Sequence, residues 1–96
     1  MTDDAELKQI VVLARNDQLE AMRVAAGLTI VGHGVMLLFM SRALTAAEAD
    51  SEQAELVELT EIETRTTVQA MGEYFELLTA AELGAMLLEA DVVMSL

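Results

Sequence analysis

The chain has 96 residues, 54% of them hydrophobic, and its 17 acidic residues outnumber five Lys and Arg to give a formal net charge of −12. Such a length predicts one domain, residues 1–96, and the negative charge repels phosphate backbones and anionic lipid, so we expect no nucleic-acid or membrane partner. The absence of cysteine excludes disulfides, thiolate metal sites and a cysteine nucleophile, and with an acidic rather than basic start it favours a cytoplasmic protein.

The first half of the chain predicts a strand, a helix and a second strand. The β-branched and apolar run 7–15 is typical of a strand covered on both faces. Asp17 is placed to begin a helix over 17–31, which Gly32 ends. The apolar segment 35–40 follows at once, which completes the unit from which parallel sheets are built. The helix is expected to pack on the sheet through Leu19, Met22, Ala26 and Ile30.

Two Thr-Ala-Ala-Glu sequences predict capping boxes at the starts of further helices. The first, at Thr45, opens a helical segment that continues to Ile62, with a break near Ser51. The Thr- and Val-rich segment 66–71 predicts the third strand. The second capping box opens a helix over 80–89, and a last strand is expected over 91–96. The predicted order is therefore β-α-β-α-β-α-β, preceded by residues 1–6, which we expect to be mobile.

Two alternatives to this fold remain open. Good helix formers over 51–63 and 75–90 also suit an all-helical chain. The run 24–40 carries no charge apart from its histidine and approaches the length of a membrane span, although Gly32-His33-Gly34 would then lie in its middle.

Ligands of open parallel sheets bind beyond the carboxyl ends of the strands. Two arginines are expected at this edge, Arg15 after the first strand and Arg42 after the second, beside helix N-termini that also favour anions. They predict a small-anion site, and the alternative is that both arginines pair with the abundant acidic residues. The candidate ligand-binding residues are Arg15, Asn16, Asp17, Ser41, Arg42, Gly72 and Tyr74.

The sequence contains no recognisable catalytic, metal or cofactor motif. Gly-x-Gly-x-x-Gly does not follow the first strand, and no Gly-Lys-Ser/Thr phosphate loop is present. The single histidine, His33, is expected in a turn at the amino end of the second strand, hydrogen-bonded to backbone and remote from the ligand edge. Carboxylate clusters lack an ordered metal-ligand spacing. We therefore predict a protein without metal, cofactor or catalytic residues.

The pattern of 16–17, 21–25 and 32–39, Asn-Asp, Ala-Met-Arg-Val-Ala and Gly-His-Gly-Val-Met-Leu-Leu-Phe, resembles the DsrE/DsrF/DsrH-like family of small, Tus-like sulfur-relay proteins. The closing segment 89–94, Glu-Ala-Asp-Val-Val-Met, is similar to the end of the same family's domain. The resemblance implies a flavodoxin-like, three-layer α/β fold with a small parallel sheet. It also implies trimers or hexamers, sometimes of mixed subunits, and persulfide transfer by a cysteine after the third strand.

In this chain the corresponding region, Met71-Gly72-Glu73-Tyr74, has no thiol. We therefore expect a non-catalytic, homo-oligomeric DsrE-like protein that serves as a scaffold or accessory subunit of sulfur relay or sulfur metabolism, with related subunits as further partners. The apolar excess also favours a subunit interface. The alternative is a small-anion or small-ligand binding module or sensor at the carboxyl ends of the strands. An enzyme whose active site is shared between subunits is a third hypothesis.

Overall fold

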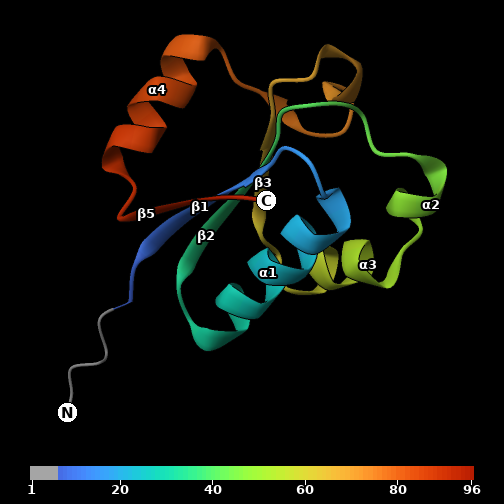
Figure 1. Cartoon of the computed structure of the whole chain (residues 1–96), viewed down its shortest axis with the longest axis horizontal. Coiled ribbons are helices and arrows are strands. Elements are labelled where there is room, and N and C mark those ends of the chain that lie inside the picture. The colour runs from blue at the N-terminus through green and yellow to red at the C-terminus, as the bar shows by residue number, and fades with distance from the viewer. Residues whose placement is uncertain (1–6) are drawn as a thin grey trace.

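The computed structural model, which describes residues 7–96, is an α/β fold with one parallel sheet and helices on both of its faces (Figure 1). This confirms the predicted fold class over the all-helical alternative. No helix of the described part is long and apolar enough to cross a membrane. The expectation for residues 1–6 lies outside the described residues. The elements are β1 Gln9–Ala14, α1 Gln18–Val31, β2 Gly34–Phe39, α2 Ala46–Ala49, α3 Glu52–Leu59, β3 Glu63–Thr66, the 3-10 helix η2 Gln69–Met71, β4 Glu76–Leu77, α4 Ala80–Glu89 and β5 Val92–Ser95.

The strands lie in the order β4-β3-β2-β1-β5, with β1 between β2 and the edge strand β5. β1 pairs along its whole length with β2, from Gln9 opposite Gly34 to Ala14 opposite Phe39. The chain then adds β3 and β4 on the same side, and α4 returns it to the other side of β1, where β5 pairs. The direction of the strand order therefore reverses between β1 and β5, and such a reversal is where parallel sheets open a crevice.

Alternate residues of the strands face two separate hydrophobic clusters. On the first face of the sheet, Val12, Leu37 and Phe39 pack against α1 and, further out, residues of α3. On the second face, Val11, Leu13 and Leu38 pack against α4. Because α1 and α3 share the first face while α4 covers the second alone, most of the core lies on the first face (Figure 1).

Helix ends follow the predicted signals closely. Asp17 caps α1 by accepting a hydrogen bond from the Glu20 backbone N–H, and Gly32 ends that helix with φ of 114°, in the left-handed region that glycine adopts without strain. Complete capping boxes form at Thr45 and Thr79. The break expected near Ser51 is confirmed, since this residue caps α3 and separates it from α2.

The third strand is the main correction to the sequence analysis. It lies at Glu63–Thr66, and the predicted segment 66–71 leaves the sheet after its first residue and ends in η2. The cause is Thr66, whose hydroxyl donates to the Phe39 carbonyl and accepts from the Val68 N–H, which turns the backbone away from the sheet. The two-residue β4 was also not predicted, so the observed order has one strand more than β-α-β-α-β-α-β.

The predicted packing face of α1 is confirmed for Leu19, Met22 and Ala26 but not for Ile30. Ala21, Met22, Ala25 and Ala26 are buried, whereas Ile30, which we expected against the sheet, is 70% exposed. Small alanines bring the helix close to the sheet, and the larger apolar side chain is left at the solvent side of its last turn.

Candidate functional site

Loops after β1 and β2 form the carboxyl edge of the sheet, where the predicted site residues were expected. Both loops are held together by a hydrogen bond of 2.6 Å from the Ser41 hydroxyl to the Arg15 carbonyl. The backbone N–H groups of Arg15 and Asn16 donate to the Leu96 carbonyl, and the Asp17 carboxylate caps α1. These groups therefore hold the edge together and are already hydrogen-bonded within the chain.

Arg42 forms the strongest charged contact of this edge. Its two terminal nitrogens lie 2.7 and 2.8 Å from the two carboxylate oxygens of Glu48. Glu48 also accepts from the Thr45 N–H and from Gln18 Nε2, at 2.9 and 3.2 Å. The guanidinium, more than any other neighbour, lowers the pKa of Glu48 to about 2, and the same contact raises the pKa of Arg42. Arg42 is thus neutralised by a neighbouring carboxylate, the alternative that the sequence left open.

The buried amide of Gln18 completes this cluster. Gln18 is only 2% exposed at the first turn of α1, and its amide nitrogen supports Glu48. Its Oε1 has no hydrogen-bond partner among the described residues. The sequence analysis did not select Gln18, because nothing local distinguishes this glutamine from an exposed one.

Arg15, in contrast, makes no hydrogen bond or ion pair through its guanidinium to the part of the chain that the structure describes. The two arginines of the predicted anion site are therefore not equivalent, since one is free to attract an anion and the other is held in a bidentate ion pair.

A cavity of about 580 Å³ opens beside these loops, at the carboxyl ends of β2 and β3. Of the predicted site residues, Tyr74 lines it and Gly72 does not. Gly72 has a packing role, since a Cβ at this position would lie 2.7 Å from a methyl group of Leu77. The lining is almost entirely apolar and consists of Met22, Phe39, Ala43, Leu44, Thr45, Ala46, Ala49, Ala54, Val57, Glu58, Ala70, Met71, Tyr74 and Phe75.

The five alanines in that lining explain why the cavity exists and why it was missed. They come from the loop after β2, from α2, from α3 and from η2, and small side chains at all five positions leave space between these elements. Alanine is also a strong helix former, so in the sequence these residues indicate only helical structure.

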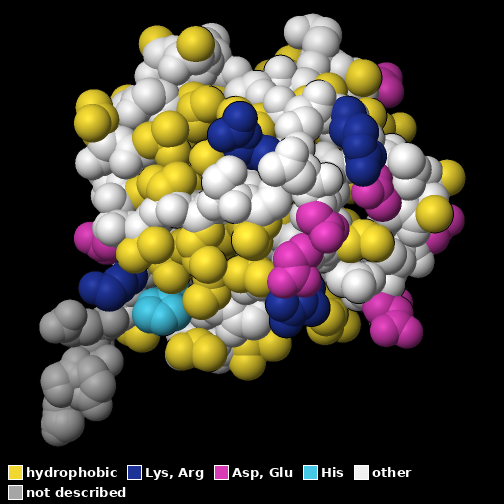
Figure 2. Space-filling model, viewed as in Figure 1, with side chains coloured by type: hydrophobic (Ala, Val, Ile, Leu, Met, Phe, Trp, Pro, Cys, Tyr) yellow, Lys and Arg dark blue, Asp and Glu magenta, His cyan; other side chains and the backbone are white. Residues whose placement is uncertain are grey.

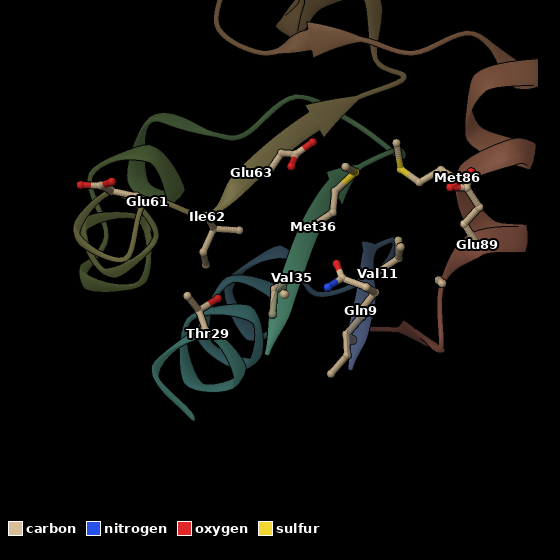
Figure 3. Close-up of a pocket in the computed structure, with 13 residues that line it drawn as sticks. Gln9, Val11, Thr29, Val35, Met36, Glu61, Ile62, Glu63, Met86 and Glu89 are labelled. Carbon is tan, nitrogen blue, oxygen red and sulfur yellow. The ribbon is translucent and has the colours of Figure 1, made fainter. Parts of the chain in front are cut away.

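A second cavity, of about 460 Å³, lies at the opposite, amino-terminal edge (Figure 3). Glu61, Glu63 and Glu89 line it, but Figure 3 shows the Glu61 side chain directed away from the other two. No group of three or more His, Asp or Glu residues within 7–96 is arranged to hold a metal ion. Near this edge His33 Nδ1 accepts from the Lys8 backbone N–H at 3.0 Å, which confirms the structural role predicted for the histidine.

Comparison with known proteins finds no family model, no curated protein and no solved structure that matches this chain. Two features of the chain's own geometry bear on function: an apolar cavity at the carboxyl edge of the sheet and a sheet face covered by one helix.

Proposed function

We propose that this chain is a non-catalytic, oligomeric DsrE-like protein that acts as a scaffold or accessory subunit of sulfur relay or sulfur metabolism. The parallel β-α-β start and the Gly-His turn before β2 support the family, and the lack of cysteine supports a non-catalytic role. The strand order differs from the 2-1-3-4-5 order of flavodoxin. The proposed likeness to flavodoxin is therefore limited to a parallel sheet between layers of helices.

Helix α4 carries the oligomer part of the proposal. Seven of its ten residues are apolar, yet none is buried, and Leu88 is 89% exposed. Val93 of the neighbouring edge strand β5 is also exposed, and β5 contains no charged residue. In Figure 2 the upper left, where Figure 1 places α4, presents hydrophobic and uncharged side chains. A helix that is apolar on nearly all sides is typical of one buried in an assembly, and a bare apolar strand edge is normally covered.

The proposed occupant of this surface is a second copy of the chain. Subunits of a trimer or hexamer meet through complementary surfaces, and the apolar surface of α4 and β5 is suited to contact with the apolar surface of another copy. Because each copy carries a charge of −12, we expect salt to strengthen the association by screening repulsion.

Native mass spectrometry and light scattering of the purified full chain test the assembly. We expect a trimer or hexamer that Leu88→Glu converts to smaller species, whereas Leu59→Glu, at a leucine of α3 that is also exposed, leaves it intact. A wild-type monomer at low and high salt would overturn the oligomer proposal. Transfer of sulfur from a persulfide donor to the purified chain alone would overturn the non-catalytic assignment.

A second candidate function is a small-ligand binding module or sensor, and the cavity at the carboxyl edge favours it. Its volume falls within the range of small-molecule sites, it lies beyond the carboxyl ends of β2 and β3, and Tyr74 lines it. Native mass spectrometry of the protein purified from its own host tests this function directly. We expect a retained small molecule whose mass is lost when Ala49→Trp fills the cavity mouth.

A further inference from the structure

The charge distribution around the carboxyl-edge cavity restricts what the cavity can bind. Glu58 is the only charged residue that lines it, and its carboxylate makes no hydrogen bond or ion pair to residues 7–96. Two arginines are sequence neighbours of lining residues, and both are paired: Arg23 with Glu20 and Arg42 with Glu48. An anionic ligand would therefore meet a free carboxylate and no free cation among the lining residues.

The wall that α2 and α3 form extends this acidic character. Residues 46–59, which span both helices, contain five acidic residues and no Lys or Arg. With a net charge of −12 on the whole chain, the field at this wall attracts cations and repels anions. The acidic residues are Glu48, Asp50, Glu52, Glu55 and Glu58.

Aromatic rings supply the other half of the recognition. Tyr74 lines the cavity yet is 76% exposed, so its ring lies at the mouth. Phe75 lies deeper against Phe39, with ring centroids 5.5 Å apart. An exposed tyrosine face attracts an ammonium group, and the buried Phe39 and half-buried Phe75 favour an apolar body.

We propose that this cavity binds a small molecule with an apolar body and a protonated amine. The apolar body lies among the alanines and Phe75, and the ammonium group lies at the mouth between the Glu58 carboxylate and the Tyr74 ring. This assignment rests on the ligand-binding candidate above and names the class of ligand for the same site.

Calorimetry with three probes that share one apolar body tests the proposal. Naphthylmethylamine, naphthalenemethanol and naphthoate share the naphthalene ring and carry a cationic, a neutral and an anionic group. We expect the amine to bind at least about tenfold more tightly than the carboxylate, with the alcohol between them. Glu58→Gln should remove the advantage of the amine over the alcohol, whereas Glu55→Gln, on the same helix but outside the lining, should preserve it.

Site occupancy is tested separately from charge preference. Ala49→Trp places a large ring in the lining and should abolish binding of all three probes, and Ala47→Trp, on the same helix but not in the lining, should not. Failure of every probe to bind the wild type overturns the ligand-binding function itself. Tightest binding of naphthoate, or equal effects of Glu58→Gln and Glu55→Gln, leaves the site in place and overturns the amine assignment.

Discussion

Helices α1 and α4 are both rich in apolar residues and lie on opposite faces of the same sheet, but they bury their side chains to different extents. In α1 the side chains of Ala21, Met22 and Ala25 are no more than 1% exposed. In α4 none is buried, and Leu83 and Met86 are only partly covered. The first face thus has a complete core within one chain, whereas the second face keeps apolar surface in contact with solvent, which is where we place the contact with a second copy.

The largest expected effect comes from a matched pair of methionines, one in each helix. Met22→Ala removes a fully buried side chain and should lower the free energy of unfolding by about 2–5 kcal/mol. Met86→Ala should lower the free energy of unfolding by only about 1 kcal/mol, because folding removes just part of the Met86 side chain from water. Urea unfolding of dilute protein measures both, and equal losses would refute the difference between the faces.

Glu48 gives the next effect, at the edge of the first face. Glu48→Gln should lower the free energy of unfolding at neutral pH by about 1–2 kcal/mol, because it breaks the ion pair with Arg42, whose half-exposed side chain lets solvent weaken the contact. The folded-state pKa of about 2 lies below the ordinary 4.5, so this stabilisation is complete above pH 4.5 and is lost as the pH falls towards 2.

Urea unfolding of wild type and Glu48→Gln across this pH range measures the effect. The gap between the two proteins should close on acidification, and a gap that persists at the acidic end would contradict the assignment. Glu52→Gln, at an exposed position in the first turn of α3, serves as the control.

The capping box of α4 gives a smaller effect. Thr79→Ala should lower the free energy of unfolding by about 1 kcal/mol, because it leaves the Glu82 backbone N–H at the start of α4 without its acceptor. Because α4 packs loosely, the loss should appear as faster hydrogen exchange in α4 with little change in α1. Thr45→Ala removes the same motif from α2 on the first face, and identical exchange patterns for the two variants would show that the two faces open together.

Leu88→Ala should have the smallest effect on the single chain. At 89% exposure this side chain contributes almost nothing to the core, so the free energy of unfolding of dilute protein should change by less than about 0.5 kcal/mol. Ile30→Ala at the exposed end of α1 is the matched control. If α4 is buried between copies, the loss of stability caused by Leu88→Ala should grow with protein concentration, whereas the loss caused by Ile30→Ala should stay constant.

The first half of the fold could be predicted because its signals are local. Asp17 at the start of α1 and Gly32 at its end are set by neighbouring residues, and the apolar runs on either side have no plausible position except a covered sheet. The capping boxes at Thr45 and Thr79 are local for the same reason.

The third strand and the cavity depend on contacts between distant residues. The strand 63–66, Glu-Thr-Arg-Thr, has no apolar residue to mark it, and Arg65 is placed by Glu63 and by Glu76 of the neighbouring strand. The cavity likewise forms only when four separate segments meet. Sequence reasoning located Tyr74 at the correct edge, and it identified neither Gln18 nor the contact between Arg42 and Glu48.

The position of β1 between β2 and β5 has a consequence for synthesis of the chain. β1 is made first among the strands, but its partner β5 is made last, and the Gln9 N–H bonds to Asp91 across 82 positions of sequence. At ordinary translation speeds of about 5–20 residues per second, roughly 4–16 seconds separate the two strands. During that interval one apolar edge of β1 is open to chaperones and to neighbouring nascent chains. The nascent chain is therefore most prone to aggregate before β5 has been made.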